Sequence, residues 1–143
     1  MKKIGLGLCT ILFFATACKK DNNDSVPITT ENLAGNYKFA SATVKYGSSP
    51  EQDYSSFVFT EECEKDDITT LKTDGTYTVL DAGVQCDPPT EDSGTWSLSG
   101  SNTIVMDGED FTISRFDGKT LQLTDTYTDN GQTITLKLTL SKQ

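Results

Sequence analysis

Apolar and polar residues alternate with a period of two from Leu33 onward, a pattern that predicts β-strands. Threonine and branched or aromatic residues are abundant in this region, and Gly, Asn or Asp interrupts the alternation at short intervals. A sustained helical period of 3.6 is missing from the sequence. The pattern predicts about eight strands, at 35–46, 54–60, 67–72, 76–81, 93–99, 103–107, 110–116 with 119–127 (one strand or two), and 132–141.

Turn residues between these segments predict how neighbouring strands pair. Gly75 follows Asp74 in a position that closes a three-residue hairpin loop, and Asn130-Gly131 is the preferred two-residue hairpin turn. Apolar positions match outward from each turn, so the chain from about residue 66 onward reads as sequential antiparallel hairpins. The predicted register places Leu71 opposite Tyr77, Ile113 opposite Leu123, Leu123 opposite Leu138, Leu121 opposite Leu140 and Tyr127 opposite Ile134, and it turns Trp96 and Leu98 back onto Ile104 and Met106.

A meander of this many strands leaves unpaired edges unless the sheet closes on itself. The predicted fold is therefore all-β: a small, antiparallel, up-and-down β-barrel of about eight strands. A β-sandwich is the competing architecture, but the connections are too short for several crossovers. A barrel that spans a membrane fits poorly, because its outward face must be apolar and here the polar face carries Thr, Lys and Asp.

The N-terminal segment has the pattern of an exported bacterial lipoprotein. Lys2 and Lys3 precede eleven apolar residues, Ile4 to Phe14, and small residues then lead to Cys18. The prediction is a signal peptide over 1–17, lipid on Cys18, a flexible tether over 18–32 and one domain over 33–143. An ordinary signal peptide is the alternative, whereas a membrane-spanning helix needs about 20 apolar residues. The start after Cys18 also resembles an outer-membrane export tag, so we expect attachment to the outer membrane, on its periplasmic side or at the cell surface.

Composition narrows the chemistry. The 143 residues include 12 basic and 21 acidic residues, and loss of residues 1–17, which hold two lysines and no acid, changes the net charge from −9 to −11. An acidic surface repels nucleic acid, so no nucleic-acid partner is expected. The chain has no histidine, which excludes Ser-His-Asp, Cys-His and His-based zinc chemistry. No catalytic residue, metal or cofactor is predicted, and we expect a monomer.

The sequence predicts different roles for the four cysteines. Cys9 leaves with the signal peptide and Cys18 takes the lipid, which leaves Cys63 and Cys86 in an oxidising compartment. A disulfide is the expected pairing in that compartment, because the alternatives, two free thiols or a two-cysteine metal site, lack further soft ligands. The two cysteines also lie almost symmetrically about the turn at Gly75, which is consistent with this pairing. In the chain-entropy account, such a loop contributes about 3 kcal/mol of stability.

Several short segments resemble one family in their order along the chain. They are Leu33-Ala34-Gly35-Asn36-Tyr37-Lys38-Phe39, Cys63-Glu64-Lys65-Asp66-Asp67, Thr73-Asp74-Gly75-Thr76-Tyr77, Cys86-Asp87 and Gly94-Thr95-Trp96-Ser97-Leu98. Over residues 33–141 the chain resembles the lipocalin-like lipoproteins of Gram-negative bacteria. Two positions depart from the lipocalin pattern: Tyr37 stands where Trp opens the barrel, and the only arginine, Arg115, is far from the C-terminal strand where the partner of that Trp belongs.

The resemblance implies a calycin-type barrel that binds a small apolar ligand and has no catalytic residues. The opposing interpretation is that the same aromatic residues fill the barrel, because barrels of about eight strands are either packed solid or hold one small ligand. The candidate lining residues are Tyr37, Phe39, Phe57, Phe59, Tyr77, Trp96, Leu121 and Leu123.

An acidic concentration at Glu61, Glu62, Glu64, Asp66 and Asp67 supports two further hypotheses. The first is an interaction module whose loops engage an envelope protein, against the plainer interpretation of a solvated surface. The second is a calcium site, although the spacing does not match Asp-x-Asp-x-Asp-Gly. Enzymatic activity from paired carboxylates is the least supported, because nothing singles out one pair.

Overall fold

One antiparallel sheet of nine strands forms the fold in the computed structural model, which describes residues 26–89 and 91–143. From β3 to β9 each strand pairs with the next in sequence, and β9 returns to pair with β1, so that eight of the strands close a barrel. The predicted up-and-down barrel is confirmed. The strands are β1 Gly35–Tyr46, β2 Gln52–Asp53, β3 Ile68–Leu71, β4 Thr76–Leu80, β5 Glu91–Ser99, β6 Thr103–Met106, β7 Glu109–Phe116, β8 Thr120–Asp129 and β9 Gln132–Lys142.

The turns fix the register that the sequence predicts. Gly75 has a φ of +84°, and Asn130 and Gly131 have φ values of +50° and +78°, the left-handed backbone that two-residue hairpins require. All of the predicted cross-strand neighbours are confirmed: Leu71 with Tyr77, Trp96 with Met106, Leu98 with Ile104, Ile113 with Leu123, Leu123 with Leu138, Leu121 with Leu140, and Tyr127 with Ile134.

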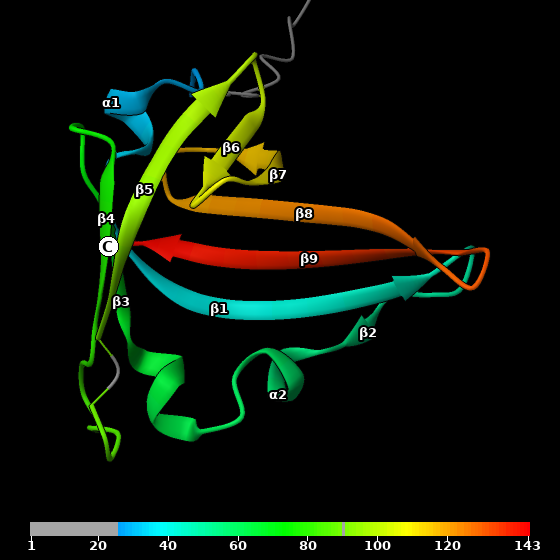
Figure 1. The fold of residues 1–143 in the computed structure, drawn as a ribbon, viewed down its shortest axis with the longest axis horizontal. Helices are drawn as coiled ribbons and strands as arrows, with labels where there is room; N and C mark the ends of the chain where they lie inside the picture. Colours follow the sequence, from blue (N-terminus) through cyan, green and yellow to red (C-terminus); the bar gives the residue numbers. More distant parts are fainter. Residues whose placement is uncertain (1–25, 90) are drawn as a thin grey trace, which may run out of the picture.

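The long strand β1 joins the two halves of the barrel. It pairs with β9 along most of its length, but with β3 only at Gly35–Lys38 and with β2 only at Thr43 and Val44. A register shift lies between Phe39 and Ser41, and such a bulge bends a strand. Figure 1 shows the consequence: β3, β4 and β5 run steeply across the view, whereas β8, β9 and β1 run across it horizontally.

The predicted strand over 54–60 is wrong. This stretch holds the short helix α2, Ser55–Val58, and it is followed by the 3-10 helix η1, Glu62–Asp66. Local side-chain bonds explain the difference, since Asp53 Oδ1 accepts from the Ser55 amide at 3.0 Å and Ser55 Oγ accepts from the Ala42 amide at 3.1 Å. Side chains of Asp and Ser that bond nearby backbone groups compete with strand ladders.

The packed domain begins earlier than Leu33, the start that the sequence predicts. Val26 and Ile28 pack against the core, and helix α1, Thr30–Leu33, follows with Thr29 as its cap, which accepts from the Asn32 amide at 3.2 Å. Residues 26–32 therefore belong to the domain rather than to a tether. The signal peptide, Cys18 and the rest of the predicted tether lie outside the described residues. Within 26–89 and 91–143, no helix is long and apolar enough to cross a membrane.

Candidate ligand-binding site

One end of the barrel is filled with side chains. Leu33, Ile104 and Leu121 are fully buried, and Tyr37 and Trp96 are 1% and 3% exposed. The polar atoms of the aromatic pair are satisfied: the Tyr37 hydroxyl donates to the Leu33 carbonyl at 2.5 Å, and Trp96 Nε1 donates to the Lys72 carbonyl at 2.9 Å. We call this region, which lies beneath α1, the packed end.

The other end of the barrel is hollow. A cavity of about 320 Å³ lies beside a second of about 240 Å³, and the two share four lining residues: Val58, Met106, Leu123 and Leu138. We call these two cavities the hollow end. Apolar side chains dominate both walls, as is usual for small-molecule sites. The larger is also lined by Phe39, Phe59, Glu64, Asp67, Thr69, Val79, Asp92 and Leu140, and the smaller by Ala42, Thr43, Tyr54, Phe111, Asp125, Leu136 and Lys137.

Helix α2 forms one wall of the hollow end. Val58 contributes to both cavities and Tyr54 to the smaller one. Phe59 follows the helix and packs on Phe39, with ring centroids 4.5 Å apart. In Figure 1 α1 and α2 lie on opposite sides of the barrel, so each end has its own cover.

The predicted lining residues divide between the two ends. Phe39, Phe59 and Leu123 line the cavities, whereas Tyr37, Trp96 and Leu121 fill the packed end and Tyr77 is buried in the core cluster. Phe57 lines neither region: it is 73% exposed and stacks on Tyr54 with ring centroids 4.8 Å apart. The prediction for Phe57 is wrong because strand alternation does not apply within α2.

Several cavity residues escaped the sequence-based prediction. Met106, Leu138 and Leu140 are not aromatic, whereas six of the eight predicted lining residues are. A signal was nevertheless available, because the turn registers place Leu138 opposite Leu123 and Met106 opposite Trp96. A cross-strand partner of an inward-facing residue faces inward as well.

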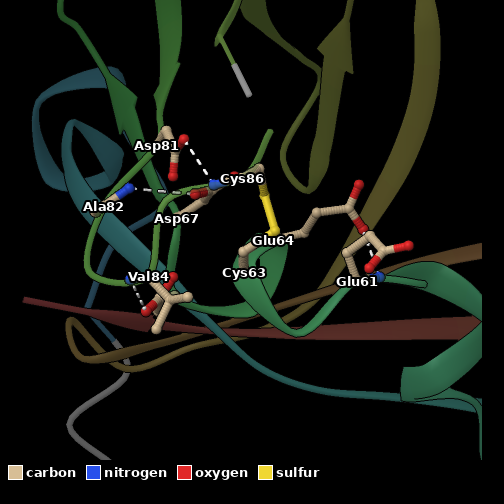
Figure 2. The surroundings of a disulfide bond; sticks show 9 residues. Glu61, Cys63, Glu64, Asp67, Asp81, Ala82, Val84 and Cys86 are labelled. Carbon is tan, nitrogen blue, oxygen red and sulfur yellow. Dashed lines mark hydrogen bonds between the residues drawn. A yellow bond between two sulfur atoms is a disulfide. The ribbon is translucent and has the colours of Figure 1, made fainter. Parts of the chain in front are cut away.

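A disulfide closes the rim beside the larger cavity. Cys63 in η1 bonds Cys86, with an S–S distance of 1.98 Å and Cα atoms 5.4 Å apart, which confirms the predicted pair. Figure 2 shows this bond in yellow, with carboxylates grouped around it. Because Cys63 immediately precedes Glu64, a lining residue, the bond holds part of the cavity wall against the segment that carries Cys86.

Three aspartates hold the loop that leads to Cys86. Asp67 accepts from the Ala82 amide at 3.3 Å and Asp81 from the Cys86 amide at 3.0 Å, as the dashed lines in Figure 2 mark, and Asp66 accepts from the Val84 amide at 2.9 Å. Asp66 and Asp67 of the acidic concentration therefore hold backbone amides in place. This structural role was missed from the sequence, because it depends on the loop that the disulfide brings back.

The charged side chains of the larger cavity are all acidic: Glu64, Asp67 and Asp92. Asp67 is only 8% exposed, and burial raises its pKa above the ordinary value, against the lowering effect of the Ala82 amide. Neighbouring carboxylates raise that pKa further. The smaller cavity is lined by Asp125 and Lys137, and Lys137 Nζ lies 2.5 Å from Glu51, which lines neither cavity.

Comparison with known families decides the identity of the fold. A family model described as a lipocalin-like domain matches residues 16–137, which is more than half of the chain. The chain belongs to the lipocalin-like domain family. Members of this family typically bind small ligands rather than catalyse reactions. No curated protein matches the chain.

At the packed end of this lipocalin-like domain, a lysine of the C-terminal strand lies against two aromatic rings. Lys142 of β9 places its Nζ 5.7 Å from the Tyr37 ring centroid and 5.9 Å from that of Phe116, within cation–π range. The same Nζ donates to the Asn32 carbonyl at 2.6 Å, and burial lowers the pKa of Lys142. Tyr37 and Lys142 thus lock the barrel end, while Arg115 pairs with Asp117 at the surface, 2.9 Å away.

Metal binding finds no geometric support in the part of the lipocalin-like domain that the structure describes. Across residues 26–89 and 91–143, no group of three or more Cys, Asp or Glu side chains has an arrangement that could hold a metal ion. The acidic loop hypothesised as a calcium site uses its carboxylates on backbone amides instead.

Proposed function

We propose that this protein is a lipid-anchored cell-envelope binding protein, which holds a small hydrophobic ligand in its barrel and performs no catalysis. The observation that carries the proposal is the hollow end, where two adjoining cavities of about 320 and 240 Å³ are lined mainly by apolar side chains. Sites for small molecules are concave, largely apolar and carry a few polar groups. Membership of the lipocalin-like family supports the same function.

The anchoring part of the proposal is supported by the sequence pattern that ends at Cys18. Because the packed domain begins by Val26, only residues 19–25 separate the lipid from the barrel. Labelling of cells with radioactive palmitate tests this part directly. Wild-type protein should take up the label and fractionate with the outer membrane, whereas Cys18→Ala should do neither; equal labelling of the variant would contradict the anchor.

The ligand part is tested by native mass spectrometry of the protein purified from its own membranes in mild detergent. We expect a complex with one small apolar molecule per chain, which denaturation releases. The matched variant Leu138→Trp places a large side chain in both cavities and should reduce the bound fraction. A fully folded protein that carries no molecule and takes up no added apolar compound would contradict the proposal.

A further inference from the structure

We propose that the ligand of the hollow end is an apolar molecule with a positively charged group, such as an aliphatic amine. Its cation would lie near Asp67 and Asp92, and its apolar part against Met106, Leu123 and Leu138. This inference rests on the proposed function and adds the chemical class of the ligand. Its grounds are the charges that line the cavities and the lack of a basic partner for them among residues 26–89 and 91–143.

The first ground is the sign of the lining charges. The larger cavity combines an apolar wall with three carboxylates and no basic side chain among its described lining. The smaller cavity adds Asp125, and its single basic residue, Lys137, directs its Nζ to Glu51. A ligand with a carboxylate would meet like charges in a site of low dielectric, where such contacts are most unfavourable.

The second ground is the state of Asp67. The residue is 8% exposed, and its side chain accepts one hydrogen bond, a long one of 3.3 Å from the Ala82 amide to Oδ1. Within residues 26–89 and 91–143, no ion pair and no hydrogen bond to its Oδ2 is formed. A largely buried carboxylate with one long hydrogen bond and no counterion is unfavourable, and an ammonium group supplies both a counter-charge and a further donor.

The position of Asp92 is consistent with the same site. It lies on β5 opposite Val79, and both residues line the larger cavity that Asp67 also lines. Unlike Asp67, Asp92 is exposed to solvent. The pair therefore offers one buried and one exposed carboxylate at the polar part of an otherwise apolar wall. An amphiphile with a cationic head and an alkyl tail matches this arrangement.

The test uses three probes with the same tail: octylammonium, octanol and octanoate, titrated calorimetrically into the full-length protein below micelle-forming concentrations. The variants are Asp67→Asn, Asp92→Asn and the control Asp110→Asn, an exposed acid on β7 that makes the same change of net charge outside the cavities. Thermal unfolding of each variant verifies that it is folded. Asp92→Asn keeps the test valid if Asp67→Asn does not fold.

Octylammonium should bind roughly tenfold more tightly than octanol, because its ammonium group donates charge-assisted hydrogen bonds, and octanoate should bind most weakly. Asp67→Asn and Asp92→Asn should remove this preference while octanol binding stays, and Asp110→Asn should keep it. Equal affinities for the three probes, or an equal effect of all three variants, would overturn the inference and leave the proposed function standing. Failure of every probe to bind would overturn the proposed function as well.

Discussion

The two ends of the barrel are built from the same strands but differ in packing and in the hydrogen bonding of their polar groups. On β8, Leu121 is fully buried in the packed end, and two residues later Leu123 borders both cavities. On β1, Tyr37 lies in the packed end and Phe39 faces a cavity. The strands therefore do not determine which end is hollow. What determines it is the covering segment: α1 inserts the buried Leu33, whereas α2 only borders the hollow end with Tyr54 and Val58.

Polar groups follow the same division. In the packed end the hydroxyl, indole and ammonium groups of Tyr37, Trp96 and Lys142 all donate to backbone carbonyls. In the hollow end the carboxylate of Asp67 is buried with a single long hydrogen bond. A fully hydrogen-bonded network favours one rigid arrangement, whereas a carboxylate with one long hydrogen bond beside a cavity can gain a further donor from a ligand. This contrast is the basis for the predictions that follow.

The largest predicted difference in stability is between Leu121→Ala and Leu123→Ala. Both side chains are buried, at 0% and 5% exposure, but Leu121 is surrounded by packed neighbours and Leu123 borders empty space. Leu121→Ala should lower the free energy of unfolding in urea by about 3–5 kcal/mol, and Leu123→Ala by about 2 kcal/mol. Equal losses at the two positions would show that the ends are packed alike.

Loss of the disulfide should affect the rim of the hollow end. Cys63 and Cys86 are 23 residues apart, so reduction or the double change to Ser should lower the free energy of unfolding by about 3 kcal/mol. Three aspartates also hold the adjoining loop through hydrogen bonds. The folded structure should therefore persist without the disulfide, and its circular dichroism spectrum should change little. The measurement is urea unfolding with and without reductant, and an unchanged midpoint would contradict the prediction.

Alkaline pH should destabilise the packed end. Burial raises the pKa of Tyr37 to about 12, against about 10 in an unfolded chain. The neutral form is thus favoured on folding, and its contribution is present below pH 10 and lost as the pH rises through 12, by about 3 kcal/mol.

Tyr77 titrates in the same direction, because its hydrogen bond to Asp107 and burial raise its pKa to about 12. Tyr37→Phe should therefore remove part, not all, of the loss of stability between pH 10 and pH 12. Thermal unfolding across this range gives the answer. A variant with the same alkaline slope as wild type would disprove the role of Tyr37.

The helix cap that precedes the packed end should have a smaller effect. Thr29 accepts from the Asn32 amide at the start of α1, the helix that supplies Leu33. Thr29→Ala should lower the free energy of unfolding by about 1 kcal/mol, whereas Thr29→Ser keeps the acceptor and should change it by less than about half that amount. Urea unfolding of the two variants checks the cap, and equal losses would argue against it.

The smallest effect should come from Phe57. Because it is 73% exposed, Phe57→Ala should change stability by less than about 0.5 kcal/mol and leave octanol binding unaltered. Phe59→Ala, which removes the contact with Phe39 and part of the cavity wall, should weaken both stability and binding. Equal effects of the two variants would contradict the assignment of Phe57 to the solvent side and of Phe59 to the cavity side of this segment.

Much of the fold followed from local features of the sequence. Two-residue and three-residue turns at Asn130-Gly131 and Gly75 set the register of their hairpins, and one apolar face per strand then implied a closed barrel. The segment 54–60 escaped prediction because its backbone follows bonds made by Asp53 and Ser55, which outweigh alternation. The Cys63–Cys86 bond was predictable because the two cysteines lie at nearly equal distances in sequence from the turn at Gly75.

The division into a packed and a hollow end could not be predicted in the same way. Alternation shows that Tyr37, Phe39, Leu121 and Leu123 face inward, but not how much space lies between them. That depends on segments far away in sequence: α1 and Lys142 at one end, α2 and η1 at the other. The contact of Lys142 with Tyr37 likewise depends on the pairing of β9 with β1, which are at opposite ends of the domain sequence.

Calorimetric titration of octanol into the protein, beside the cavity-filling variant Leu138→Trp, tests the division into two ends most directly. A saturable site with one octanol per chain in the wild type, lost in a folded Leu138→Trp, is the predicted result. The absence of saturable binding, or binding that the variant leaves unchanged, would contradict a barrel that is packed at one end and receives its ligand at the other.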